Sequence, residues 1–89
     1  MSVVGSILTG VAAKVGAELV GKALGDRFGP AGGKLTEVVI GEIATRVGVA
    51  PAELPEMAGK EPKIVENAIR DVEAAMPELI ELWAKGLDG

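Results

Sequence analysis

The sequence predicts an all-α fold in a single small domain of residues 1–89. Two observations predict it. Apolar residues recur at steps of three and four along most of the chain, which is the period of one helix face. Glycine and proline cluster at 25–34 and 49–62, where breaks between helices are expected. We therefore expect three main helices, at about 3–24, 34–47 and 62–86.

The first segment, 1–25, predicts an apolar helix over about 3–24 that Gly25 closes. Its bulky residues fall on one arc of a helical wheel and its small residues mainly on the opposite arc, so the helix has no properly polar face. A helix that is apolar all round is usually buried or associated with a membrane. Lys14, Glu18 and Lys22 follow one another at four-residue steps, and the acid is expected to pair with both lysines.

The same segment is rich in glycine, and each glycine inside a helix costs roughly 1 kcal/mol relative to alanine. Packing must offset this penalty, and small residues at four-residue spacing let another backbone approach closely. The candidate close-packing interface consists of Ala13, Gly16, Ala17, Gly21 and Gly25. The spacing suits three partners equally well: a second helix of the same chain, another copy of the chain, or a lipid bilayer.

Residues 26–33 predict a loop, and residues 34–48 a second helix over 34–47 that Gly48 ends. Its apolar positions follow strict four-residue steps: Leu35, Val39, Ile43 and Val47. The β-branched run at 37–40 would also suit a strand, but the longer period favours a helix. Glu42 and Arg46 are expected to pair on its surface. Residues 49–61 predict a connection that contains a short helical turn near 51–58, because proline at 51 suits a first helical position.

The last segment, 62–89, predicts an acidic amphipathic helix over 62–86. Pro62 suits its first position, Gly86 suits its C-terminal cap, and Pro77 should kink it because proline cannot donate the backbone hydrogen bond. Surface pairs are expected between Glu66 and Arg70 and between Glu81 and Lys85. One apolar stripe runs along the helix and forms either core or a surface for a partner's groove: Val65, Ile69, Val72, Met76, Leu79 and Trp83.

Charge and composition exclude several classes of function. The net charge is −4, and residues 49–89 carry nine acidic and four basic side chains, which argues against nucleic acid as a partner. The chain has no cysteine and no histidine, so no metal ligands of these types and no histidine base are present. The segment GAELVGKA at 16–23 has the spacing of a phosphate-binding loop, but it lacks the final Ser or Thr and a preceding strand. We expect no catalytic, cofactor or metal site and no enzyme.

The longest uncharged stretch, residues 1–13, is shorter than the about 20 residues that a spanning helix needs, and no basic residue precedes it as in a signal peptide. A spanning helix that extended to Gly25 would have to bury Lys14, Glu18 and Lys22 in a bundle interior or a lumen.

Several stretches together carry a resemblance. The Gly/Ala/Val-rich opening, GPAGGKLTEVVIGEIATRVGV at 29–49, APAELPEM at 50–57 and AIRDVEAAMPELIEL at 68–82 resemble small proteins encoded in phage and prophage morphogenesis regions. Some of those proteins are virion-associated and others are holin-like. The resemblance implies a non-enzymatic part that works in many copies, located in a virion or the host cytoplasm, or alternatively at the inner membrane.

Three hypotheses follow for the function. The first is a structural component of a phage particle that forms homo-oligomers or binds other assembly proteins. The second is a membrane-active, holin-like protein that acts through its N-terminal helix. The third is a small helical adaptor that docks the stripe of its last helix into a partner's groove.

Overall fold

The computed structural model confirms the all-α fold class. It describes residues 3–25 and 32–88, and most of the predicted loop at 26–33 lies outside these residues. In the described ranges the chain forms five α-helices and one 3₁₀ turn. These elements are α1 (Val3–Val15), α2 (Glu18–Leu24), α3 (Gly32–Val47), the 3₁₀ turn η1 (Pro51–Glu53), α4 (Leu54–Lys60) and α5 (Pro62–Asp88).

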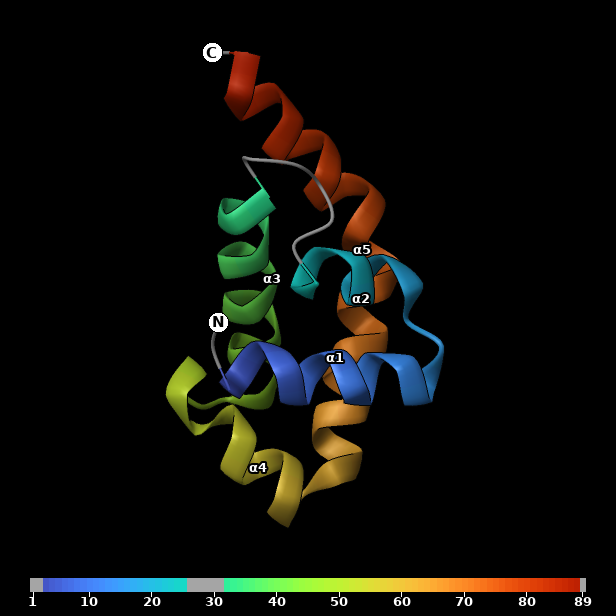
Figure 1. Ribbon diagram of the computed structural model, residues 1–89, viewed down its shortest axis with the longest axis vertical. Helices are drawn as coiled ribbons and strands as arrows, with labels where there is room; N and C mark the ends of the chain where they lie inside the picture. The colour runs from blue at the N-terminus through green and yellow to red at the C-terminus, as the bar shows by residue number, and fades with distance from the viewer. Residues whose placement is uncertain (1–2, 26–31, 89) are drawn as a thin grey trace.

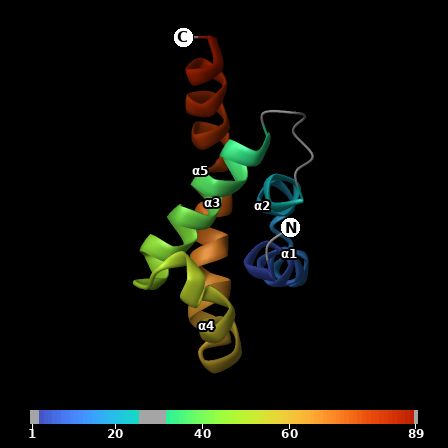
Figure 2. The same ribbon diagram turned by 60° about the vertical axis from the view of Figure 1, so that its left-hand side comes forward.

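Helix α5 is the central element, and it contacts each of the other four α-helices. Helices α3 and α5 run side by side in opposite directions, and α4 packs beside the first turns of α5 (Figure 1). Helices α1 and α2 form an antiparallel hairpin that crosses α5 on one side, so that the two pairs make two layers (Figure 2). The last turns of α5 extend past the other helices (Figures 1 and 2).

The prediction of one helix over 3–24 is wrong, because the chain reverses at Gly16. Gly16 has a φ of +78°, a left-handed conformation that glycine adopts without the steric cost of a Cβ. The backbone N–H of Ala17 donates to the carbonyl of Ala12 at 2.8 Å, which closes the end of α1 as in a Schellman motif. The apolar pattern continues across this corner, so the wheel showed one helix where the chain has two.

The second predicted helix is confirmed, and it begins two residues earlier, at Gly32. Gly48 ends it with a φ of +90°, and the N–H groups of Gly48 and Val49 both donate to the carbonyl of Ala44. The expected single turn near 51–58 is a 3₁₀ turn at Pro51–Glu53 followed directly by the helix α4, Leu54–Lys60. Most of the segment predicted as a connection is therefore helical.

The last helix begins at Pro62, as predicted, but it ends at Asp88 rather than at 86, so Gly86 lies inside the helix instead of capping it. Pro77 lies within α5 and does not split it, and the helix is bowed in Figure 1. Because proline has no N–H, the carbonyl of Glu73 four residues before it loses its usual helix partner.

The core lies between the two layers and is wholly apolar among the described residues. Every helix contributes to it except the 3₁₀ turn. Its buried members are Leu8, Ala12, Ala17, Val20, Ala23, Leu24, Leu35, Val39, Ile43, Ala44, Leu54, Val65, Ala68, Ile69, Val72 and Met76. The hydroxyl of Thr36 also donates to the carbonyl of Ala23 and so ties α3 to the last turn of α2.

The expected ion pairs are found on two helices. Arg46 pairs with Glu42 at 3.2 Å on α3, and Lys85 pairs with Glu81 at 3.2 Å on α5. The expected pairs of Glu18 with Lys14 and Lys22 and of Glu66 with Arg70 are not found among the described residues.

Lys14 pairs with Glu66 of α5 at 3.5 Å rather than with Glu18, because the corner at Gly16 separates Lys14 and Glu18 onto different helices. Arg70 donates to Asn67 at 3.5 Å instead of pairing with Glu66.

Candidate functional site

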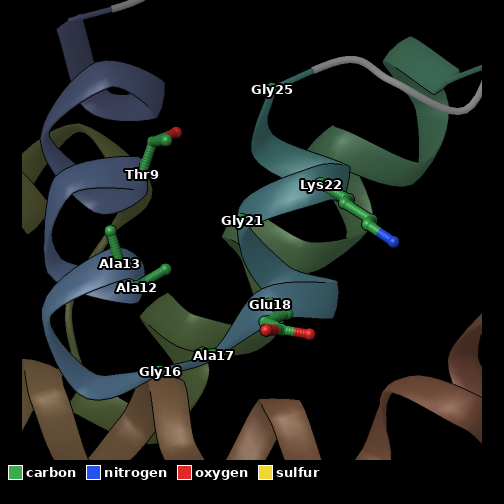
Figure 3. A pocket seen from close by; sticks show the side chains of 9 residues that line it. All are labelled: Thr9, Ala12, Ala13, Gly16, Ala17, Glu18, Gly21, Lys22 and Gly25. Atoms are coloured by element: carbon green, nitrogen blue, oxygen red, sulfur yellow. The ribbon is translucent and has the colours of Figure 1, made fainter.

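A hollow lies between α1 and α2, and we call it the α1–α2 hollow. Its volume is about 550 Å³. Small residues form most of its wall, and one acid and one base stand at the α2 side (Figure 3). The lining residues are Thr9, Ala12, Ala13, Gly16, Ala17, Glu18, Gly21, Lys22 and Gly25. All five residues of the predicted close-packing interface are among them.

The hollow exists because the side chains along the hairpin are too short to meet. A Cβ built at Gly16 or Gly21 would find no atom within 4 Å, and the same holds for Gly10 on the outer side of α1. At these glycines no other part of the described chain approaches closely. Ala17, by contrast, is buried in the domain's own core, so the chain itself covers one part of the predicted interface and leaves these glycines uncovered by other described residues.

The orientation of α1 explains why its small residues remain uncovered. Leu8 and Ala12 are fully buried, and Val4, Val11 and Val15 pack against the core. The opposite side of the helix carries Ser6, Gly10 and Ala13, which are exposed. Lys14 is the only charged residue of α1, so the outer surface of α1 consists of small side chains and a single charge.

One acid from α5 completes the corner beside the hollow. The carboxylate of Glu73 accepts hydrogen bonds from the backbone N–H of Val20 at 2.9 Å and of Leu19 at 3.3 Å. These are amides of the first turn of α2, which have no partner inside the helix. Glu73 was not singled out from the sequence, where its position matches an ordinary acid on a helix surface. Only the tertiary fold reveals its role.

The same contact occupies backbone amides of the segment GAELVGKA at 16–23, which has the spacing of a phosphate-binding loop. The segment forms the α1–α2 corner and most of α2, and no strand precedes it in the described part of the chain. In a phosphate-binding loop the amides at this point would face the phosphate. Here two of them already bind the carboxylate of Glu73, and Glu18 adds a second acid at the helix start.

The stripe predicted on the last helix divides into two parts. Val65, Ile69, Val72 and Met76 are fully buried and belong to the core, whereas the next two members, Leu79 and Trp83, are partly buried against it. The part of α5 after Met76, residues 77–88, we call the α5 arm. It carries Leu82, which is 66% exposed and lies outside the stripe predicted from the sequence.

No cluster of three or more potential acidic, cysteine or histidine metal ligands occurs within 3–25 and 32–88. None of the helices in those ranges combines the length and the apolar character needed to cross a bilayer. Comparison of the chain with family models, with curated proteins and with solved structures found no match.

Proposed function

We propose that this protein is a non-enzymatic assembly component that works in several copies and self-associates through the α1–α2 face. This is the role implied by the resemblance to virion-associated phage proteins, and we place it in a virion or in the host cytoplasm. The observation that carries the proposal is the α1–α2 hollow, because six glycine and alanine residues line it and the described chain leaves it open.

The hairpin contains glycines that destabilise its helices and that bring no packing benefit within the described chain. Gly10 and Gly21 lie inside helices, where each costs roughly 1 kcal/mol relative to alanine, and no neighbour in the described chain requires their small size. A helix from another molecule could use this space, since small residues allow two backbones to approach closely. Self-association then explains why the penalty is tolerated.

A membrane-active role is the alternative, and the burial of α1 weighs against it. The bulky residues that would enter a bilayer, such as Leu8 and Val11, face the core, and α1 would have to leave the domain to expose them. The adaptor hypothesis meets a similar difficulty. Val65, Ile69 and Val72 are buried inside the domain, so a partner could reach them only after unfolding.

Light scattering coupled to size-exclusion chromatography tests the proposal over a wide range of protein concentrations. We expect the wild-type mass to rise above that of one chain, and Ala13→Arg to keep the protein monomeric, because the long cationic side chain stands in the hollow. Ala74→Arg is the matched control, since Ala74 is exposed on α5 and does not line the hollow. The control should associate like the wild type.

A wild-type protein that stays folded and monomeric at every concentration contradicts the proposal. Flotation with anionic vesicles separates the alternative: recovery of the folded wild type with the vesicles would favour the membrane role, whereas the proposal expects it to stay in the lipid-free fraction. Equal association of Ala13→Arg and Ala74→Arg would place the contact elsewhere and also contradict the proposed face.

A further inference from the structure

We infer that the α1–α2 hollow receives the α5 arm of a second copy, so that each molecule both provides an arm and accepts one. This inference rests on the proposed self-association and specifies its geometry. It joins two features of the structure that the single chain leaves unused, namely an open apolar hollow and a projecting helix end with an exposed leucine.

The arm has the shape and chemistry of a ligand for the hollow. It is the end of a long helix that extends past the rest of the molecule (Figures 1 and 2). Leu82 is 66% exposed, more than Val38 or Ile64, the other large apolar side chains that stand exposed where side chains are described. A leucine side chain that projects from a helix suits a depression walled by glycine and alanine, because the missing side chains leave the volume that the leucine fills.

The charges of the two surfaces match in one orientation. Glu18 and Lys22 stand four residues apart on the α2 side of the hollow, and both are exposed (Figure 3). Glu81 and Lys85 stand four residues apart on the arm, on either side of Leu82 in the sequence. If the arm lies antiparallel to α2, Lys22 faces Glu81 and Glu18 faces Lys85. The parallel orientation would place like charges together, so the pairs select the antiparallel one.

The arm cannot serve the hollow of its own molecule. Helix α5 is continuous from Pro62 to Asp88, and its first half is fixed in the core by Val65, Ile69 and Val72. The arm therefore points along the same axis and away from the body. Because the donated and accepting surfaces differ, two copies can exchange arms reciprocally in a closed dimer, or successive contacts can form a larger ring if the rotation closes and a filament if it does not.

Two single variants and their mixture test this geometry. Ala13→Arg blocks the hollow but keeps the arm, and Leu82→Asp removes the apolar contact of the arm but keeps the hollow. We expect each variant alone to remain monomeric by light scattering, with the dissociation constant for self-association raised by roughly tenfold to a hundredfold. Far-UV circular dichroism checks that both are folded, which the exposure of both positions predicts.

The mixture gives the decisive result. The arm of Ala13→Arg can still enter the hollow of Leu82→Asp, so an equal mixture should form a complex with the mass of two chains and nothing larger. A contact that does not use the arm would instead leave Leu82→Asp able to associate on its own. A mixture that stays monomeric while the wild type associates would overturn the inference.

A charge exchange tests the orientation separately. The order of the two charges beside the hollow is reversed by Glu18→Lys with Lys22→Glu. The order of the two charges on the arm is reversed by Glu81→Lys with Lys85→Glu. Neither exchange alters the net charge. Each exchange alone should weaken association, and all four substitutions in one chain should restore it. Failure of the combined variant to recover would overturn the antiparallel arrangement.

The two proposals fail in different ways. Normal association of Leu82→Asp together with loss of association in Ala13→Arg would show that the hollow receives something other than the arm, and only the further inference would fall. A wild type that remains monomeric at every concentration would remove both.

Discussion

The Oε1 atom of Glu73 on α5 accepts a hydrogen bond from the backbone N–H of Val20 on α2 at 2.9 Å, across 53 residues of sequence. Its other oxygen accepts from Leu19 at 3.3 Å. Ala17, at the N-cap position of α2, has no side-chain oxygen that could do this. A long-range carboxylate thus takes the place of a local cap and binds the hairpin to the central helix.

Removal of this carboxylate should destabilise the domain. Glu73→Ala leaves two amides without their partner, and loss of a cap costs about 1–2 kcal/mol. In a domain of this size each kcal/mol lowers the melting temperature by about 4–8 °C. Glu73→Gln keeps one acceptor oxygen and should lose less. Thermal unfolding followed by circular dichroism measures both, with Glu78→Ala on the exposed side of α5 as control. Equal melting temperatures for the two alanine variants would contradict the capping role.

The same substitution should have opposite effects at two glycines of the hairpin. Gly16→Ala forces a Cβ into a left-handed residue and should lower the free energy of unfolding by about 1–2 kcal/mol. Gly10→Ala lies within α1 and should raise it by about 0.5–1 kcal/mol. Neither added Cβ would meet an atom within 4 Å, so the two changes in the free energy of unfolding reflect backbone conformation rather than packing. Urea denaturation decides, and effects of the same sign would contradict the assignment of the corner.

Two aspartate substitutions on α5 should separate core from surface. Val72 is fully buried, and Val72→Asp places a carboxylate among apolar side chains, which should unfold the domain. Leu82 is exposed, and Leu82→Asp should change the free energy of unfolding by no more than about 0.5 kcal/mol. Far-UV circular dichroism and urea titration report both. A folded Val72→Asp protein would mean that this stripe is a surface after all.

The ion pair between Lys14 and Glu66 should contribute little. The side chain of Lys14 is 71% exposed, and pairs of this kind are worth about 0.2–1 kcal/mol. We expect Lys14→Met to lower the free energy of unfolding within that range at low salt and to have a smaller effect at 1 M salt, where charges are screened. A loss that is large and independent of salt would point to a packing role for the lysine stem.

The fold class and most helix positions follow from periodicity, because the apolar steps of α3 and α5 match the buried residues. The corner at Gly16 could not be found in this way. Apolar residues continue in phase on both sides of it, and glycine inside a helix looks the same in the sequence as glycine in a left-handed turn. The opposite error occurs at Gly86, where the sequence predicts the C-terminal cap of the last helix. In the structure Gly86 lies within α5.

The candidate surface was predicted in part. Spacing alone brought together Ala13, Gly16, Ala17, Gly21 and Gly25, which line one hollow, although they do so from two helices rather than from one. Leu82 and Glu73 were missed because each role depends on where α5 lies relative to the hairpin. A helical wheel describes one helix at a time and contains no information on such contacts.

The long-range carboxylate also has a consequence for how the chain is made. Helix α2 has seven residues, fewer than the about 12–15 that an isolated helix needs to persist in water. During synthesis α2 leaves the ribosome before its stabilising acid, which follows 53 positions after Val20. Helix α2 therefore gains this cap only after Glu73 has emerged, and until then its aliphatic residues are open to chaperones and proteases.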